Sequence, residues 1–209
     1  VGTNNLSTAI IILGIAVIVV FVSDKRYMQF VWIAAAGAGM MALFLGMESY
    51  RLERIAIWKN PEAYEKGYQT IQGLYAIGSG GLLGKGLGQS IQKLSFLPEP
   101  QNDMIFAVIC EELGLFGAVA VIFMFLFMLY RFLVIAGNAP DLFGAMLVTG
   151  VLAHIAIQVV LNIAVVTNVI PNTGITLPFI SYGGTSVLFL MIEMGMVLSV
   201  SNQIRLEQQ

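Results

Sequence analysis

Apolar residues along the chain gather into five long runs. Each run approaches the length of about 20 residues that a helix needs to cross a bilayer. The runs are Leu6 to Val22, Gln29 to Met47, Met104 to Tyr130, Leu142 to Val166 and Ile180 to Val200. This pattern predicts an all-α, polytopic membrane helix bundle with about five transmembrane helices, forming a single membrane domain over residues 1–209.

The polar connections between the runs differ in length. Three are short: Ser23–Met28, Arg131–Asp141 and Thr167–Phe179. The connection between the second and third runs is a long loop, from about Glu48 to Asp103. Its first part, Tyr50 to Trp58, has the pattern of a short interfacial helix, and the Asn60-Pro61 pair is expected to end it.

Composition agrees with a membrane location. Hydrophobic residues make up 58% of the chain and charged residues 11%, whereas soluble domains carry about 25% charged residues. The net charge of -2 lacks the basic footprint of a nucleic-acid-binding protein. Cys110 is the single cysteine, which excludes an intrachain disulfide and argues against a cysteine-based zinc site.

The cations of the short loops predict an orientation. Lys25, Arg26 and Arg131 in these loops, and Arg205 in the tail, favour the cytoplasmic side for those parts and the outside for the long loop. The long loop itself holds several cations, but the rule is weakest for long loops. This orientation places Val1 outside, and no signal peptide precedes it, so we expect the chain to be part of a longer protein.

A glycine-rich stretch, Gly78 to Gly88, lies within the long loop. A phosphate-binding loop needs glycine five residues before the Gly-Lys pair and Ser or Thr after it. Here those positions hold Ser79 and Gly86, so the spacing does not fit. We expect a tightly turning loop against the membrane surface, in which Lys85 and Lys93 can meet an anionic headgroup.

Asp103 closes the long loop directly before the third apolar run. Two interpretations stay open. In the first, Asp103 is the N-cap of the following helix. In the second, it is a general base at the mouth of a membrane cavity, where partial burial raises its pKa above the ordinary value of about 3.9. Glu99 is either a solvated loop acid or part of the same site.

Acidic side chains also interrupt the apolar runs. Charges at that depth are costly and face protein or water. Glu111 and Glu112 are therefore expected either to contact substrate in a cavity or to be held by hydrogen bonds near the interface. Glu193 in the last run has the same two interpretations.

A polar stripe marks the fourth run. His154, Gln158 and Asn162 recur at every fourth position and share one helix face. Such a stripe forms hydrogen bonds between helices or lines a cavity. His154 is the only histidine, so a histidine-based metal site or catalytic triad is not supported.

Two segments resemble the SEDS family (FtsW, RodA and SpoVE), bacterial peptidoglycan glycosyltransferases of the plasma membrane. One runs from Gly67-Tyr-Gln through Gly84-Lys-Gly-Leu-Gly-Gln-Ser and Leu97-Pro-Glu-Pro-Gln-Asn-Asp103 to Glu111-Glu-Leu-Gly114. The other runs from Asn162 through Ile170-Pro-Asn-Thr-Gly-Ile-Thr-Leu-Pro-Phe to Ser181-Tyr-Gly-Gly-Thr-Ser186. The likeness covers essentially the whole chain.

Details of the resemblance place the chain within the family. Thr176 before Leu-Pro-Phe is similar to the FtsW and SpoVE branch, since RodA-type sequences tend to carry Pro there. Family members have more spanning helices than this chain, so it resembles their C-terminal half, and we expect the chain alone to be inactive. Asn5-Leu-Ser-Thr8 departs from the usual Pro-Asp-Leu-Gly-Thr, and Ser95 stands where some members carry an acid.

The resemblance implies a reaction, the polymerisation of lipid II with release of undecaprenyl pyrophosphate. Asp103 matches the essential aspartate of the family and is implied to be the general base. The implied substrate-binding residues are Lys85, Lys93, Glu99 and Glu111, with the turn of Ser181, Tyr182, Gly183 and Gly184 beneath the site. A divalent cation, Mg²⁺ or Mn²⁺, is compatible with the pyrophosphate leaving group.

The implied partners are a class B penicillin-binding protein and other membrane proteins of the division machinery, with no nucleic acid. Two alternatives to catalysis stay open. A lipid II flippase would depend more on polar lining such as His154, Gln158, Asn162 and Glu111 than on Asp103. A non-catalytic scaffold of the division machinery would depend on its contacts alone.

Overall fold

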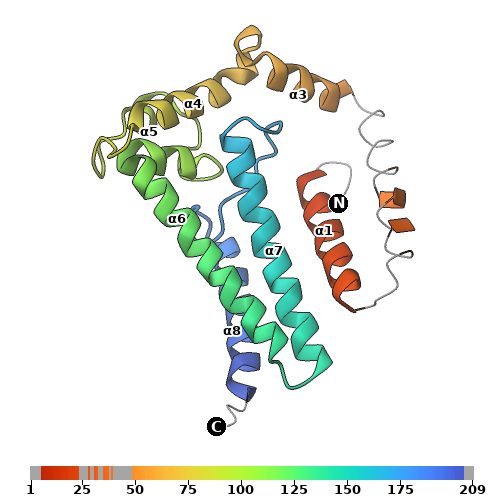
Figure 1. Ribbon diagram of the computed structural model, residues 1–209. Coiled ribbons are helices and arrows are strands. Elements are labelled where there is room, and N and C mark those ends of the chain that lie inside the picture. The colour runs from red at the N-terminus through yellow and green to blue at the C-terminus, as the bar shows by residue number, and fades with distance from the viewer. Residues whose placement is uncertain are drawn as a thin grey trace. The chain divides into compact units, whose positions relative to one another are not determined.

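The computed structural model describes residues 6–23, 28, 31–32, 35–37, 39 and 49–204 (Figure 1). The regular elements of this part of the chain are all helices, so the all-α prediction is confirmed there. The α-helices are α1 (Leu6–Ser23), α3 (Ser49–Lys59), α4 (Tyr68–Gly80), α5 (Ile91–Ser95), α6 (Ile105–Gly137), α7 (Leu142–Val166) and α8 (Gly184–Gln203). Two short 3₁₀ helices, η1 (Pro61–Ala63) and η2 (Glu65–Gly67), lie between α3 and α4.

Three described helices are long and apolar enough to cross a membrane, namely α6, α7 and α8. In α1 the apolar stretch Thr8–Ser23 is shorter. Most of the second predicted run, Gln29 to Met47, lies outside the described residues, as do Lys25, Arg26 and Arg205. The chain is therefore a membrane protein with several candidate transmembrane helices, of which three match predicted runs.

Helix α6 extends beyond the predicted end at Tyr130. It continues to Gly137, so Arg131 lies in a helix rather than in a short loop as predicted. The physical reason is the apolar sequence that follows, in which Phe132 and Ile135 are buried. Helix α7 then starts at Leu142, where the Asp141 carboxylate accepts a hydrogen bond from the Gly144 amide over 2.9 Å and caps the helix.

The predicted long loop is largely helical. Helix α3 confirms the helix expected from Tyr50 to Trp58, and it ends at Lys59, before Asn60-Pro61 as expected. Helix α4 follows η2, and α5 begins after Ser90, whose hydroxyl accepts from the Lys93 amide over 3.0 Å. The loop is thus a set of short helices before α6.

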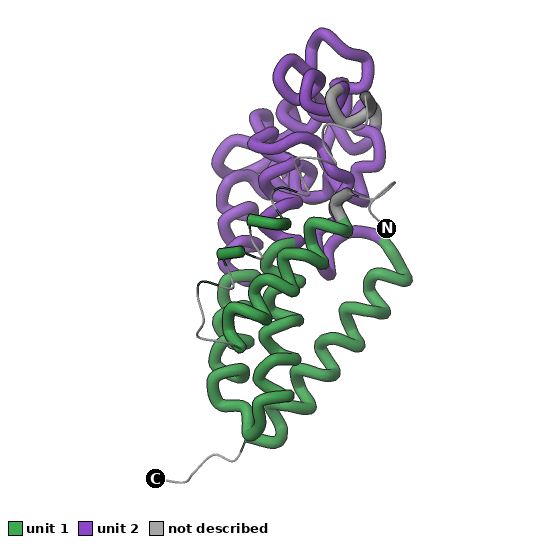
Figure 2. The backbone as a smooth tube through the Cα atoms, turned by 90° about the vertical axis from the view of Figure 1, so that its right-hand side faces the viewer, with its two compact units in different colours: residues 1–40, 125–157, 183–209 green, residues 41–124, 158–182 purple. Residues whose placement is uncertain are grey.

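The chain divides into two compact units, shown in different colours in Figure 2. One contains residues 1–40, 125–157 and 183–209; the other contains residues 41–124 and 158–182. In the first unit, His154 Nδ1 on α7 and the Glu193 carboxylate on α8 are joined by a hydrogen bond of 2.9 Å. The second unit holds the helical loop, Asp103 and the segment that follows α7, and it contains the site described below.

Helix α6 is broken at Gly114, which has φ 66° and ψ -164°. A break of this kind leaves backbone groups without helical partners, and such groups are costly where water is absent. The glycine-rich loop supplies the partners. Before the break, the amides of Lys85 and Gly86 donate to the carbonyls of Glu111 and Glu112, over 2.9 Å each. After the break, the Leu115 amide donates to the Gly81 carbonyl over 2.9 Å, and the Phe116 amide donates to the Leu82 carbonyl over 3.3 Å.

Glycine is required where this loop meets α6. Gly84 has φ +78°, and a Cβ there would lie 2.2 Å from the Glu112 carbonyl oxygen. A Cβ on Gly114 would lie 2.4 Å from the Gly84 amide nitrogen. The stretch is the tightly turning loop that the sequence predicted, and its backbone packs directly against the backbone of α6.

Candidate active site

A cavity of about 340 Å³ lies beside Asp103 in the second unit. Its walls come from α3, from η2 and the start of α4, and from the segment after α7. The lining residues are Glu53, Arg54, Ile57, Trp58, Lys66, Gln69, Thr70, Asp103, Asn168, Asn172 and Gly174. The cavity thus combines a buried carboxylate with two cations and several side-chain amides.

Asp103 is only 8% exposed. Helix α6 begins at Ile105, so Asp103 lies two residues before it and Met104 takes the position directly in front of the helix. The Asp103 carboxylate accepts a hydrogen bond from the Gln69 side chain over 3.3 Å, and the backbone amides of Asp103 and Met104 also lower its pKa. These partners lie outside the first turn of α6, so the geometry does not support the N-cap interpretation.

Burial raises the pKa of the Asp103 carboxyl above its ordinary range, because desolvation disfavours the charged form. Hydrogen bonds from the two backbone amides and from Gln69 oppose this rise. The nearby carboxylate of Glu99 adds to it through charge repulsion. Glu99 itself is exposed and accepts a hydrogen bond from the Asn102 side chain.

Buried polar side chains hold the backbone around Asp103. The amide of Asn162 on α7 donates to the carbonyl oxygens of Asp103 and Ile175, over 2.8 and 2.7 Å. Ser181 Oγ donates to the Asn102 carbonyl over 2.6 Å, and the Tyr182 amide donates to the Gln101 carbonyl over 2.8 Å. Ser181 and Tyr182 therefore lie against the residues before Asp103, while Gly183 and Gly184 lead into α8.

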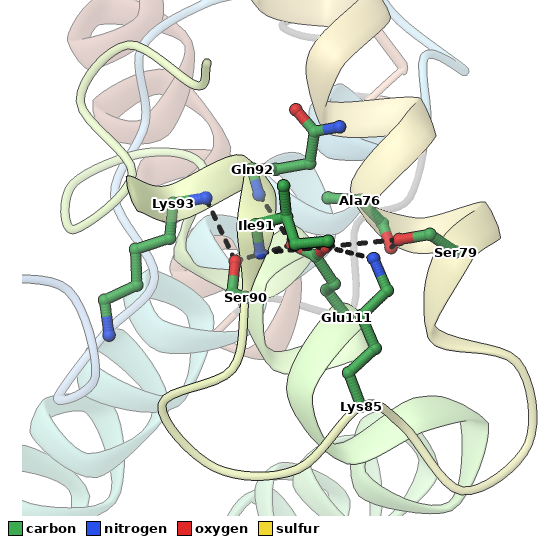
Figure 3. A network of polar contacts seen from close by, with 8 residues as sticks. All are labelled: Ala76, Ser79, Lys85, Ser90, Ile91, Gln92, Lys93 and Glu111. Atoms are coloured by element: carbon green, nitrogen blue, oxygen red, sulfur yellow. Dashed lines mark hydrogen bonds and ion pairs between the residues drawn. The ribbon is translucent and has the colours of Figure 1, made fainter. Parts of the chain in front are cut away.

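A second polar cluster surrounds Glu111 (Figure 3). Glu111 is 0% exposed, and its carboxylate pairs with Lys85 Nζ over 2.6 Å. It also accepts hydrogen bonds from the Ser90 and Ser79 hydroxyls over 2.5 and 3.3 Å, and from the amides of Ile91 and Gln92 over 3.3 Å each. The cluster ties α4, the glycine-rich loop and α5 to α6.

The second lysine of the predicted set has a weaker partner. Lys93 Nζ lies 3.7 Å from the Glu112 carboxylate, and its side chain points away from Glu111 in Figure 3. Its side chain is 46% exposed, so solvent screens this pair. The hydrogen bonds of Glu111 favour the second of the two interpretations given for these acids, whereas Glu112 has only the distant partner Lys93 among the described residues.

The polar stripe of α7 forms hydrogen bonds, as one of its two interpretations predicted. His154 reaches a second helix through Glu193. Gln158 donates to Thr176 Oγ1 over 3.3 Å, and Asn162 donates to the two carbonyls described above. Only His154 bonds to another helix, because Gln158 bonds to the segment after α7, and Asn162 bonds to that segment and to Asp103, two residues before α6.

Of the predicted site residues, only Asp103 lines the cavity. Sequence reasoning assigned no role to four other polar residues of its wall: Arg54, Lys66, Gln69 and Asn172. Gln69 and Asn172 do lie in the two segments that carry the family resemblance, and this was the available indication. Arg54 and Lys66 carried no motif that separates them from ordinary surface cations.

The described residues contain no group of three His, Cys, Asp or Glu side chains that could hold a metal ion. Glu99 is the acidic neighbour that affects the pKa of Asp103, and its carboxylate accepts a hydrogen bond from the Asn102 side chain.

Comparison with known proteins agrees with this picture. Stage V sporulation protein E of Bacillus subtilis is 45% identical over 204 residues, covering 96% of this chain and 56% of that protein. The probable peptidoglycan glycosyltransferase FtsW of Coxiella burnetii is 38% identical over 198 residues, covering 92% of this chain and 53% of that protein. The chain thus spans about half the length of these curated relatives.

A solved structure, described as "Structural coordination of polymerization and crosslinking by a peptidoglycan synthase complex", matches 99% of this chain and 57% of its own with a TM-score of 0.72 and 26% identity. A family model for FtsW, RodA and SpoVE, described as "Cell cycle protein", matches residues 1–206. The chain therefore belongs to the FtsW, RodA and SpoVE family, known as SEDS proteins.

Proposed function

We propose that this chain is the C-terminal part of a peptidoglycan glycosyltransferase that polymerises lipid II, and that Asp103 is its general base. The observation that carries the proposal is the buried Asp103 carboxylate in the wall of a cavity that also holds Arg54 and Lys66. Relatives named as probable peptidoglycan glycosyltransferases support the reaction type.

The chemistry needs a base and a place for negative charge. A sugar hydroxyl attacks the anomeric carbon of the donor, a new C–O bond forms, and the bond from that carbon to the pyrophosphate oxygen breaks. The hydroxyl proton passes to the Asp103 carboxylate. A carboxylate whose pKa is raised toward the working pH is a stronger base for this transfer than one with an ordinary pKa.

The leaving pyrophosphate needs positive charge or hydrogen-bond donors. Arg54 and Lys66 are the cations of the cavity wall. Arg54 Nη1 donates to the Asn172 carbonyl over 2.9 Å, and Lys66 pairs with Glu53 over 2.9 Å. Both side chains are exposed, so we propose that they meet the pyrophosphate or another anionic part of the substrate.

The roles expected for the second cluster stay predictions. Lys85, Lys93 and Glu111 are implied substrate contacts, but here Lys85 and Glu111 pair with each other and Glu111 is fully buried. We propose that the main role of this cluster is structural: it holds the loop that leads to Asp103 against α6. Contact of the Glu111 carboxylate with substrate would require that this buried cluster opens, whereas the side chains of Lys85 and Lys93 are 29% and 46% exposed.

The decisive experiment uses the full-length protein that contains this chain, purified and supplied with lipid II, with glycan strands separated on a gel. Asp103→Asn should lower the polymerisation rate by about 10² to 10⁴. Asp141→Asn is the matched control, because Asn and Asp cap helices about equally well. Strand formation by Asp103→Asn at the wild-type rate would refute the base assignment.

The same assay tests the two other functions. A flippase or a scaffold would form no glycan strands from lipid II, whichever residue is changed. The description of the solved relative names a peptidoglycan synthase complex, which supports the proposal that this protein also binds a partner protein. We propose a class B penicillin-binding protein as that partner, and co-purification with the full-length protein checks this independently of strand formation.

A further inference from the structure

The side chain of Gln69 donates to Asp103, and its orientation is fixed by a chain of hydrogen bonds. The chain begins at the Gly174 amide, which can only donate, and it donates to Asn172 Oδ1 over 3.0 Å. The other end of that side chain, Asn172 Nδ2, then donates to Gln69 Oε1 over 3.1 Å. This leaves Gln69 Nε2 to face Asp103 Oδ1, at 3.3 Å.

Each amide in this chain has one orientation that satisfies its neighbours. If Gln69 turned over, two oxygens would meet at Asp103 and two NH₂ groups would meet at Asn172. The second proton of Gln69 Nε2 points to the Pro98 carbonyl, 3.5 Å away. The arrangement therefore keeps a donor, rather than an acceptor, against the carboxylate.

We propose that Gln69 is a positioning residue for the Asp103 carboxylate, and that Asn172 acts through Gln69 by fixing which end of its amide faces Asp103. The proposal rests on the general-base role of Asp103. Gln69 and Asn172 both line the cavity beside Asp103, so this contact lies at the surface that a substrate reaches. A hydrogen bond to one carboxylate oxygen restricts the rotation of the carboxylate. This holds the base at a fixed angle to the hydroxyl group whose proton it accepts.

The contact also affects the pKa of the base. The hydrogen bond from Gln69 lowers the pKa of Asp103, against the larger effect of burial. The charged groups that face Asp103 are Glu99 in its own segment, Glu53 and Arg54 from α3, and Lys66 from η2. These groups are unchanged in Gln69→Leu, so a change in its pH profile reports the lost amide contact, whereas Asn172→Asp also adds a charge to the cavity wall.

The test measures kcat and KM for lipid II polymerisation across pH in the full-length protein. Gln69→Leu removes the donor. We expect kcat to fall about 10- to 100-fold at neutral pH with KM within about twofold, and the acid limb of the profile to move to higher pH. Gln72→Leu is the matched control, since it removes the same side chain three residues further along α4 and outside the cavity.

Asn172→Asp tests whether Asn172 fixes the orientation of the Gln69 side-chain amide. The new carboxylate still accepts from the Gly174 amide but can no longer donate to Gln69. Gln69 then turns its NH₂ group to the carboxylate and its oxygen to Asp103. We expect kcat to fall at least as far as in Gln69→Leu, with a shift of the acid limb in the same direction.

The double variant Gln69→Leu/Asn172→Asp separates an effect that acts through the orientation of Gln69 from a direct effect of the added charge. If Asn172 acts through Gln69, the double variant matches Gln69→Leu alone. If the double variant loses a further tenfold or more, Asn172 does not act through Gln69, and that part of the proposal fails. All variants are first checked for a wild-type elution profile and melting temperature.

Two results would overturn the proposal as a whole. One is a Gln69→Leu protein with the wild-type kcat and pH profile while Asp103→Asn is inactive. The other is a Gln69→Leu protein that loses kcat with an unmoved acid limb, which indicates a purely structural role. An active Asp103→Asn protein would instead refute the proposed function, so the two failures are distinguishable.

Discussion

The side-chain amide of Asn162 donates to the backbone carbonyl of Asp103 over 2.8 Å, and Asn162 is fully buried. The same amide group donates to the Ile175 carbonyl over 2.7 Å. One side chain on α7 thus connects the residue that we propose as the base to the segment that follows the helix. The position of the Asp103 backbone depends on a residue 59 positions away in the sequence.

Asn162→Ala should destabilise the protein and slow polymerisation. It leaves two buried carbonyls without their donor, at about 1–3 kcal/mol for each unsatisfied group. Asn138→Ala is the matched control, since Asn138 also donates to a backbone carbonyl, that of Val134, but is exposed. The melting temperature in detergent measures both, and equal losses would contradict the role given to Asn162.

Gly84→Ala should be far more harmful than Gly88→Ala. Both glycines have a left-handed φ, +78° and +76°, so both substitutions carry the backbone cost of about 1–2 kcal/mol. Only Gly84 lies against the backbone of α6, whereas a Cβ on Gly88 meets no atom within 4 Å. Melting temperatures of the two variants isolate the contact, and a similar loss in both would show that the loop does not need this close approach.

The Lys85–Glu111 ion pair should show strong coupling in a double-mutant cycle. Removing one partner of a buried pair costs about 3–5 kcal/mol, because it leaves the other charge uncompensated. Lys85→Met and Glu111→Gln together should therefore cost much less than the sum of the single changes.

A second cycle provides the reference for that coupling. Lys66 and Glu53 form an exposed pair over 2.9 Å, with side chains 67% and 42% exposed. Exposed pairs contribute about 0–1 kcal/mol, so Lys66→Met and Glu53→Gln should be nearly additive in unfolding experiments. Equal coupling in the two cycles would contradict the structural role of Glu111.

Asp103→Asn should keep or raise the melting temperature while it removes activity. The pKa of Asp103 is raised in the folded protein, so its ionised form disfavours the fold. This cost is absent below the unfolded pKa of about 3.9 and complete above the raised pKa of the folded state. The gain of the Asn variant should therefore grow as pH rises through this window, as melting curves from about pH 4 to pH 8 would show. A variant that is less stable at every pH would contradict the direction of the shift.

The sequence predicted the transmembrane helices well where apolar residues run without interruption. The ends of α7 are those of the predicted run, because Asp141 and the polar segment after Val166 mark them clearly. The end of α6 was missed because Arg131 looks like a loop residue, while the apolar residues after it continue the helix. A single cation on an exposed helix face does not end a helix.

The candidate site was predictable only in part. Asp103 stood out through the family resemblance, and its burial beside a cavity agrees with the general-base interpretation. The contact between Gln69 and Asn172 could not be predicted, because it joins segments that are 103 positions apart in the sequence. No periodicity within one helix reports such a contact.

The break of α6 at Gly114 was not predicted from hydrophobicity, although Glu111 and Glu112 interrupt the apolar run directly before it. Hydropathy measures the preference of side chains for lipid, and the break concerns the backbone. The local signs were the acidic pair and the glycine that follows it, and a glycine inside an apolar run is common in transmembrane helices.

The paired backbones of the glycine-rich loop and α6 also decide where this chain accepts added sequence. A surface loop ordinarily tolerates an epitope tag, because its ends stay in place while the inserted residues extend into solvent. Between Gly81 and Gly86 every added residue would shift the hydrogen bonds that close the break at Gly114. The short connection between α6 and α7, residues 138–141, is the better place for a tag, because these backbone bonds to α6 do not involve it.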